Sequence, residues 1–232
     1  MANTISKLVS YEDIKRYFHH GMTLMFGGFG GVGSPPTLIN HILHWGIKDI
    51  SLIGNDTGFP HIGIGQLVAQ NRVKKLITSH IGSNPIAGKL MSEGELEVEF
   101  SPQGILAERI RAGGVGLEGI VTDIGAEDPF LNKGKRVIEH KGKKTLLETA
   151  LTAEVGIIYA KKADSSGNLV YDKSARNTNP LVAMAADITI AEVNEIVPCG
   201  ELNPEEIITS GVFIDYLVLS KGVDWKWVWE AT

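Results

Sequence analysis

The sequence has little cysteine and no excess of positive charge, and each shortage excludes a class of protein. Cys199 is the one cysteine among 232 residues, so no disulfide can form within the chain. We read it as a packed or loop thiol in a reducing compartment. The formal net charge is -5 at pH 7. No basic face stands out, so a nucleic-acid partner is not expected.

Long apolar runs are also missing. None approaches the ~20 residues that a membrane-spanning helix needs. The first 18 residues alternate charged and apolar side chains and lack the apolar core of a signal peptide. We therefore expect a cytoplasmic protein that has no membrane partner.

Metal-ligand patterns are absent from the sequence as well. Its histidines are not spaced with cysteines or acids in the way that a zinc site requires, so no metal site is predicted. The histidines considered are His19, His20, His41, His44, His61 and His140.

What the chain does contain is a regular alternation of strand and helix patterns. With 43% hydrophobic and 21% charged residues it can bury one sizeable core, and we expect a single domain over residues 1–232. The alternation predicts an α/β domain whose open, largely parallel or mixed sheet is flanked by helices. The expected strands are 22–26, 49–54, 72–79, 95–100, 155–160, 168–172, 186–193 and 214–219, and the expected helices are 36–46, 65–70 and 104–113.

Two further local signals refine this prediction. Ser10 is suited to cap a first helix whose early turn is acidic, and Gly21 is expected to end it. The segment 135–151 instead alternates on both sides of a turn at 140–143, which predicts a β-hairpin appended to the sheet.

The segment Phe26–Pro36 reads FGGFGGVGSPP, with five glycines between positions 27 and 33. It lies between an expected strand and an expected helix. Glycines there allow positive φ and let main-chain N–H groups approach a ligand, and a helix N-terminus attracts anions. Ser34 is the expected N-cap, with Pro35 in the first helical turn. A single tight turn would need fewer glycines.

An alternative interpretation of the same segment is dinucleotide binding. Gly28, Gly30 and Gly33 fit G-x-G-x-x-G, and Asp56 follows the next expected strand, where a ribose-binding acid belongs. This pattern would suit an NAD-dependent oxidoreductase or a sensor. Against it, two prolines follow the loop at once, whereas a dinucleotide loop usually runs directly into its helix.

A second informative segment is Ser92–Gly116. Glu95, Glu97 and Glu99 recur with period two, so they share one strand face and are expected to face solvent. Gln103 differs, because it occupies a Pro-Gln-Gly corner between a strand and a helix, where β/α domains bind ligands. Its amide can donate and accept hydrogen bonds in a fixed position.

Five segments together resemble the alpha subunit of family I CoA-transferases, of the acetate/butyrate–acetoacetate and succinyl-CoA:3-oxoacid type. The resemblance runs in order from about Lys7 to Leu219. The segments that carry it are 21–35, 79–85, 92–114, 167–180 and 185–193. By this resemblance the glycine-rich loop is the CoA-binding signature, and Gln103 lies beside the reacting acyl group. The implied CoA-binding residues are Gly27, Gly28, Phe29, Gly30, Gly31, Val32 and Gly33.

The resemblance implies a ping-pong reaction in which CoA is a substrate and no cofactor is needed. A glutamate attacks the acyl-CoA, passes through an anhydride and carries CoA as a glutamyl thioester to a second acid. In the family that glutamate lies in a Ser-Glu-Asn-Gly segment of the beta subunit. Residues 92–95 read Ser-Glu-Gly-Glu, which lacks the asparagine. We therefore expect half an enzyme, inactive alone, in a heterotetramer of two alpha and two beta subunits.

Several other residues leave alternatives open. His80 and Asn84 either line the pocket between subunits or serve the loop structurally. Lys173 and Arg176 either meet the phosphates of CoA or support the fold and a subunit contact. Where relatives commonly have Thr-Pro-Thr-Gly, this chain has Asp123 as the second residue of the four, and Thr178 replaces a common aromatic. Trp225, Trp227 and Trp229 form an apolar edge if extended, which would dock on a neighbour rather than face water.

Overall fold

The computed structural model describes residues 6–227 and residue 230 of the chain. Their fold is built on a twisted sheet in which seven strands follow the order β11-β10-β8-β1-β2-β3-β4, and each neighbouring pair is parallel. A short strand, β9, pairs antiparallel with β8. The strands are β1 (Thr23–Phe26), β2 (Ile50–Ile53), β3 (Val73–Thr78), β4 (Glu97–Phe100), β8 (Ala153–Asp164), β9 (Leu169–Val170), β10 (Ala186–Val197) and β11 (Tyr216–Leu219).

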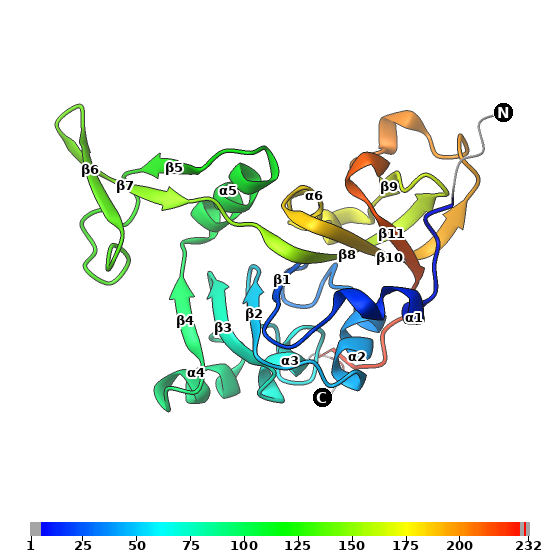
Figure 1. Ribbon diagram of the computed structural model, residues 1–232, viewed down its shortest axis with the longest axis horizontal. Helices are drawn as coiled ribbons and strands as arrows, with labels where there is room; N and C mark the ends of the chain where they lie inside the picture. Colours follow the sequence, from blue (N-terminus) through cyan, green and yellow to red (C-terminus); the bar gives the residue numbers. More distant parts are fainter. Residues whose placement is uncertain (1–5, 228–229, 231–232) are drawn as a thin grey trace.

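Helices cover both faces of this sheet (Figure 1). On one face lie α2, α3 and α4, and on the other lie α5 and α6. The helices are α1 (Tyr11–Ile14), α2 (Pro36–His44), α3 (Gly65–Ala69), α4 (Pro85–Ser92), α5 (Gln103–Gly114) and α6 (Asn179–Met184), with 3₁₀ turns at Lys15–Tyr17, Lys173–Arg176 (η2), Pro204–Glu206 and Gly211–Phe213. The predicted α/β class and mixed sheet are therefore confirmed. No helix in the described residues is long and apolar enough to cross a lipid bilayer.

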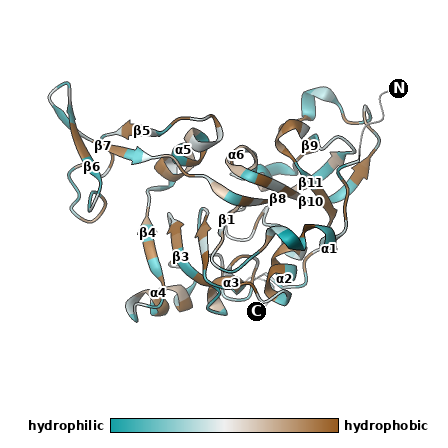
Figure 2. Cartoon of the chain, in the orientation of Figure 1, coloured by the Kyte–Doolittle hydropathy of each residue, from teal (hydrophilic) through white to brown (hydrophobic). Residues whose placement is uncertain are grey.

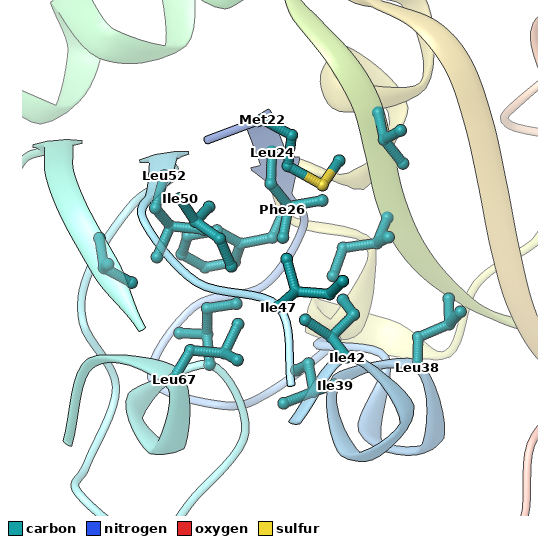
Figure 3. Packing of buried hydrophobic residues seen from close by; sticks show 14 of the residues in the cluster. Met22, Leu24, Phe26, Leu38, Ile39, Ile42, Ile47, Ile50, Leu52 and Leu67 are labelled. Atoms are coloured by element: carbon teal, nitrogen blue, oxygen red, sulfur yellow. The ribbon is translucent and has the colours of Figure 1, made fainter. Parts of the chain in front are cut away.

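Two hydrophobic clusters form the core, one on each face of the sheet. Because side chains alternate along a strand, Leu24 and Phe26 of β1 point into the first cluster and Met25 into the second. In the first cluster the apolar stripe of α2, including Leu38 and Ile42, packs on these strands (Figure 3). The sheet is thus buried on both faces, as expected for parallel strands.

The amino-terminal helix is shorter than the sequence pattern predicts. Ser10 does cap it, because its Oγ accepts from Asp13 N while the Asp13 carboxylate accepts from Ser10 N. The α-helical part ends at Ile14 and continues as one 3₁₀ turn, so it stops before Gly21. The structure also contains α4, which the sequence analysis did not predict.

A small three-stranded antiparallel sheet projects from the main body beside α5 (Figure 1). Its strands are β5 (Gly119–Thr122), β6 (Arg136–His140) and β7 (Lys143–Thr149), in the order β5-β7-β6. The predicted hairpin is confirmed: Lys141 and Gly142 both have positive φ, as a tight two-residue turn requires. Its tip is hydrophilic in Figure 2. We call β5, β6 and β7 with their connections the projecting sheet.

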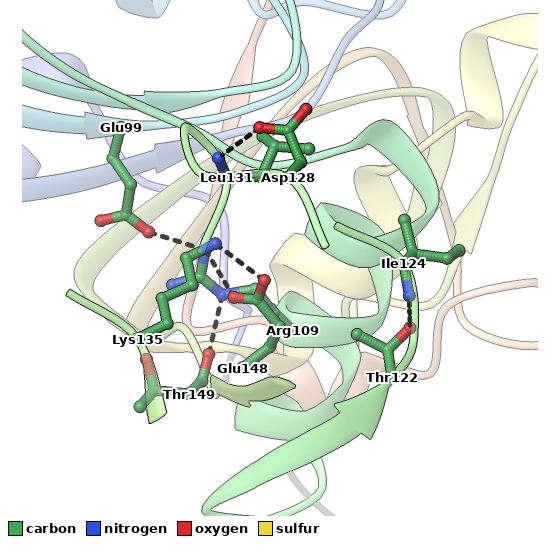
Figure 4. A network of polar contacts seen from close by, with 9 residues as sticks. All are labelled: Glu99, Arg109, Thr122, Ile124, Asp128, Leu131, Lys135, Glu148 and Thr149. Carbon is green, nitrogen blue, oxygen red and sulfur yellow. Dashed lines mark hydrogen bonds and ion pairs between the residues drawn. The ribbon is translucent and has the colours of Figure 1, made fainter. Parts of the chain in front are cut away.

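An ionic network joins the projecting sheet to the main body (Figure 4). The buried Arg109 of α5 donates from Nη1 to Glu99 Oε1 of β4 at 2.8 Å and from Nε to the Thr149 carbonyl at 2.8 Å. Lys135 Nζ lies 2.7 Å from Oε1 of Glu148, a carboxylate that is 2% exposed. The prediction that Glu99 simply faces solvent is therefore wrong.

Candidate functional site

The glycine loop, residues 27–35, lies where the strand order of the main sheet changes direction. From β1 the chain adds β2, β3 and β4 on one side, and later β8, β10 and β11 on the other. The loop follows the carboxyl end of β1, and Gly27 N donates to the carbonyl of Ile157 on β8. In open α/β sheets this switch point is the usual place for a ligand site.

Most of the loop glycines are required by packing within the chain. Gly28, Gly30, Gly31 and Gly33 have positive φ. A Cβ at Gly33 would overlap the Ala175 carbonyl, and one at Gly28 would overlap the Ser34 hydroxyl. At Gly30, by contrast, a Cβ would meet nothing within 4 Å. Open space for a neighbouring molecule is therefore found at Gly30 rather than along the whole loop.

The side chain of Asn177 and that of Asn179 brace the loop from the opposite half of the sheet. Asn177 Oδ1 accepts from Gly28 N at 3.1 Å, and its Nδ2 donates to the Val32 carbonyl at 2.9 Å. Asn179 Nδ2 donates to the Gly33 carbonyl at 2.9 Å. The fold-support interpretation of segment 173–180 therefore holds for these two amides.

The N–H groups of the loop are mostly committed to the chain itself. Phe29 and Val32 exchange both main-chain hydrogen bonds, and Ser34 N donates to the Gly31 carbonyl. Gly30 N donates to Asp56 Oδ2 at 2.9 Å. Of the N–H groups at positions 27–34, only those of Gly31 and Gly33 lack an acceptor among the described residues. Few N–H groups of the loop are therefore free for a ligand, and the CoA contacts of residues 27–33 stay a prediction.

The N-terminus of α2 is occupied by a carboxylate of this chain. Glu192 of β10 is fully buried and accepts from Thr37 N at 3.1 Å and from Leu38 N at 2.8 Å. Burial raises the pKa of Glu192, although these donors oppose the shift. The helix begins at Pro36, but its N-cap is Pro35 rather than the expected Ser34, whose hydroxyl has no partner among the described residues. The sequence signal for Glu192 was an acid flanked on both sides by apolar residues of an expected strand.

The dinucleotide alternative is not supported by the position of Asp56. This residue is 5% exposed, and its two carboxylate oxygens accept three N–H donors of the same chain. A ribose-binding acid must instead present free oxygens to the ligand. Asp56 shapes the glycine loop from within.

Gln103 lies at the first position of α5, on the same edge of the sheet as the glycine loop. Its side chain is exposed, and Nε2 donates to Asn55 Oδ1 at 3.2 Å. Asn55, which the sequence analysis overlooked, donates in turn to Asp56 Oδ2 at 2.8 Å. The signal was present, because Asn55 comes directly after a strand that neighbours β1, as the acid beside it does.

A cleft of about 480 Å³ opens beside the loop. Phe29 and Val32 line one side, and the 3₁₀ turn η2 lines the other with Lys173 and Arg176. Neither cation forms an ion pair with a described residue. Lys173 also has φ of 48°, a strained conformation of the kind that gathers at functional sites. A second cleft, of about 610 Å³, adjoins at the same two cations.

The remaining candidates differ in burial and position. Asn84 is fully buried and its Nδ2 donates to the carbonyls of Thr57 and Gly65, whereas the His80 side chain is exposed. Asp123 follows β5 and so belongs to the projecting sheet rather than to the elements around the glycine loop. Thr178 precedes α6, and its buried hydroxyl has no partner among the described residues. Among the described residues no three His, Cys, Asp or Glu side chains gather as a metal site.

The tryptophan tail folds back on this chain. A Cβ at Gly31 would meet Ile62 and Trp227, so Trp227 lies against the loop. Trp225 packs edge-on against Trp227, with ring centroids 6.4 Å apart. Trp229 lies outside the described residues. The space that Gly31 leaves is therefore filled by this chain's own side chains.

Comparisons with known proteins identify the family of this chain. A model of the coenzyme A transferase family matches residues 10–220. This chain belongs to the coenzyme A transferase family. The resemblance read from the sequence is thereby confirmed, and the chain is of the alpha-subunit type.

Two relatives and one solved structure illustrate the relationship. A Bacillus subtilis protein named "Probable coenzyme A transferase subunit alpha" is 57% identical over 97% of this chain and 98% of its own. The Clostridium acetobutylicum acetoacetyl-CoA:acetate/butyrate CoA transferase alpha subunit is 46% identical over 92% and 97%. An Escherichia coli O157:H7 acyl-CoA transferase, crystallised as a thioester complex with CoA, shares the fold at 23% identity and a TM-score of 0.83. The match covers 94% of this chain and 48% of that one.

Proposed function

We propose that this chain is the CoA-binding alpha half of a heteromeric CoA-transferase. It serves the exchange of CoA between a short-chain acyl-CoA and a carboxylic acid such as acetoacetate, acetate or butyrate. The names of its relatives support this substrate class, since one acts, by its name, on acetoacetyl-CoA, acetate and butyrate. The partner is a beta subunit, and a heterotetramer of two alpha and two beta chains is expected.

One observation carries the proposal. Gln103 and the glycine loop come from distant parts of the sequence, yet they lie at one edge of the sheet and are joined by hydrogen bonds through Asn55 and Asp56. The loop would border the CoA and Gln103 the reacting acyl group. A site with both elements suits a reaction that must hold a long thioester substrate and a developing oxyanion together.

The cleft beside the loop suggests how the charge of CoA is met. CoA carries phosphate groups, and the loop offers few unused N–H donors to them. Lys173 and Arg176 line the cleft without carboxylate partners among the described residues, whereas Lys161 and Lys162 nearby are paired with Asp172 and Glu195. We therefore assign the phosphate contacts of the loop region to Lys173 and Arg176.

The nucleophile belongs to the partner. Glu93 and Glu95 are exposed and follow α4, and Glu95 Oε2 accepts from Asn71, which precedes β3. They lie at the amino edge of the sheet, opposite the loop. A partner glutamate attacks the thioester carbonyl and releases the CoA thiolate, leaving an acyl-glutamyl anhydride. The thiolate then attacks the glutamyl carbonyl and releases the first acid, and the second acid reverses both steps.

Trapping tests this proposal. The chain is mixed with a beta subunit that carries Ser-Glu-Asn-Gly, acyl-CoA is added without acceptor, and the thioester is reduced with borohydride. Mass spectrometry should find the altered residue on the partner's glutamate, and transferase turnover should need both chains. Modification of any carboxylate of this chain, or turnover by this chain alone, contradicts the half-enzyme proposal.

A second experiment tests the phosphate assignment. Lys173→Ala and Arg176→Ala should each raise the KM for acyl-CoA severalfold while leaving the KM for an acyl-pantetheine thioester, which lacks the nucleotide, unchanged. Lys144→Ala is the matched control, because Lys144 is an exposed lysine of the projecting sheet paired with Glu127. Equal changes with both thioesters would assign the two cations to assembly or folding instead.

A further inference from the structure

Asp56 is a buried carboxylate held by N–H donors alone. Its Oδ2 accepts from Gly30 N at 2.9 Å and from Asn55 Nδ2 at 2.8 Å, and its Oδ1 accepts from Gly58 N at 2.7 Å. No described cation lies within ion-pair distance. A buried charge is retained at such a place only when hydrogen bonds compensate its desolvation.

The bond to Asp56 also fixes the orientation of the Asn55 amide. Because Asn55 Nδ2 donates to Asp56, its Oδ1 is turned towards the other side, where it accepts from Gln103 Nε2 at 3.2 Å and from Ser79 Oγ at 3.4 Å. One of the two N–H groups of the Gln103 side-chain amide therefore donates to Asn55. The other N–H and the side-chain carbonyl have no partner among the described residues, so they are available to a substrate.

From these contacts we infer that Asp56 is a positioning residue that couples the glycine loop to Gln103. This inference rests on the proposed function, in which the loop borders the CoA and Gln103 faces the acyl group. One carboxylate oxygen holds both the loop, at Gly30, and the amide that orients Gln103. A shift of the loop therefore shifts the Gln103 amide, and Asp56 influences the chemical step without touching the reacting atoms.

The first test is the substitution Asp56→Ala in the complex assembled with the beta subunit. The variant should lose about 10- to 100-fold in kcat, since small misplacements of a catalytic group are this costly. The KM for acyl-CoA should rise because the loop loses its tie at Gly30. Asp56→Asn should recover most of the kcat, because its amide oxygen can still accept from Gly30 N and Asn55 Nδ2, while its Nδ2 cannot accept from Gly58 N and the variant loses stability instead.

A double-mutant cycle separates positioning from mere stability. If Asp56 acts on kcat through Gln103, adding Asp56→Ala to Gln103→Ala should lower kcat no further, within about twofold. The rise in KM should persist in the double variant. Losses in kcat that multiply would overturn the coupling while leaving the proposed function intact. A Gln103→Ala enzyme at full rate would instead refute the role of Gln103 and the coupling with it.

Asp164 provides the matched control. It is also buried, and its carboxylate accepts from Ser166 N, Asn168 N and Asn168 Nδ2 in a loop between β8 and β9. Asp164→Ala should lower thermal stability about as much as Asp56→Ala, yet keep full kcat per assembled complex. Equal kcat in the two variants would overturn the inference. If Asp56→Ala does not fold, Asn55→Ala breaks the same chain one bond later, and an unchanged kcat in that variant would likewise overturn it.

Discussion

The glycine loop and the projecting sheet depend on different chemistry. Around the loop, directional hydrogen bonds join main-chain N–H and carbonyl groups to the side chains of Asn177, Asn179 and Asp56. At the root of the projecting sheet, Arg109 and Lys135 meet carboxylates in a largely buried network (Figure 4). The loop is thus shaped atom by atom, whereas the projecting sheet is anchored by charge.

The glycine loop and the projecting sheet also differ in how much apolar surface they expose. The loop is enclosed by neighbouring segments except near Phe29 and Gly30, while the projecting sheet and its connections leave large apolar side chains exposed. These are Val121, Ile124, Phe130 and Val137. Directional bonds suit a region whose geometry must be preset for a ligand, and charge pairs suit one that only has to stay attached. The following predictions test that contrast, beginning with the largest expected effect.

Disrupting the ionic network at the base of the projecting sheet should lower the free energy of unfolding most. Arg109→Ala leaves the carboxylate of Glu148, which is 2% exposed, with Lys135 alone, and should lower the free energy of unfolding by about 3–5 kcal/mol. Urea unfolding of the isolated chain measures this. Arg111→Ala is the control: Arg111 forms an exposed pair with Glu108, so the loss should stay below about 1 kcal/mol. Similar losses in both variants would remove the charge anchor from the account.

Changing the loop glycines comes next. Gly33→Ala places a Cβ on the Ala175 carbonyl at a φ of 76° and should cost about 2–4 kcal/mol. Gly30→Ala has similar backbone strain but open space, so about 1 kcal/mol is expected. Chemical denaturation of the two variants measures both losses in the free energy of unfolding. If Gly30→Ala cost as much as Gly33→Ala, internal packing would not explain the glycines.

Glu192→Gln should have a smaller, pH-dependent effect. Burial raises the pKa of Glu192, so the folded chain keeps a proton that the unfolded chain loses near its ordinary pKa of about 4.3. The free energy of unfolding of the parent therefore falls as pH rises through this window. The variant lacks this titration and leaves an N–H of α2 without an acceptor, at a cost of about 1–3 kcal/mol.

The difference in the free energy of unfolding between the parent chain and Glu192→Gln should be largest at the acid end of this pH window and should decrease as pH rises. Thermal melts between about pH 4 and 8 follow it. Glu97→Gln, at an exposed strand position paired with Lys75, controls for charge removal alone. A gap that widens with pH would mean that Glu192 is stabilised as the anion.

The smallest effect is expected on the surface of the projecting sheet. Val121→Ser should change the free energy of unfolding by less than about 0.5 kcal/mol, because Val121 is 55% exposed. Leu146→Ala on the neighbouring strand β7 should cost about 2–5 kcal/mol, because Leu146 is fully buried. Comparable losses would show that the exposed face is packed in solution.

Much of this fold could be read from local patterns, and the partners of the loop could not. Strand and helix alternation gave the α/β class and the hairpin, because burial periodicity and turn chemistry are local. The helix α4 was missed because it is only eight residues long and Gly88, a poor helix former, lies in its middle, although Pro85 suits a first helical position. Ser34 was assigned as a cap from its neighbours alone, but Glu192 from β10 takes that role.

The site was predictable to a similar extent. The glycine loop and Gln103 were found because both occupy strand-to-helix corners. Asn177 and Glu192 reach the loop and α2 only because β8 pairs with β1 and β10 with β8, and strand order across a sheet is not a local property. Sequence alone therefore identified the candidate ligand-binding residues more readily than those that shape the loop behind them.

The central claim is that the chain itself shapes the glycine loop before any ligand arrives. Amide hydrogen exchange, followed by NMR on the isolated chain, tests it most directly. The N–H groups of Gly28, Gly30 and Val32 should be protected without CoA, and Asp56→Ala should remove the protection at Gly30. Fast exchange throughout residues 27–34 in the parent chain would contradict the claim, since the loop would then take its shape only on binding.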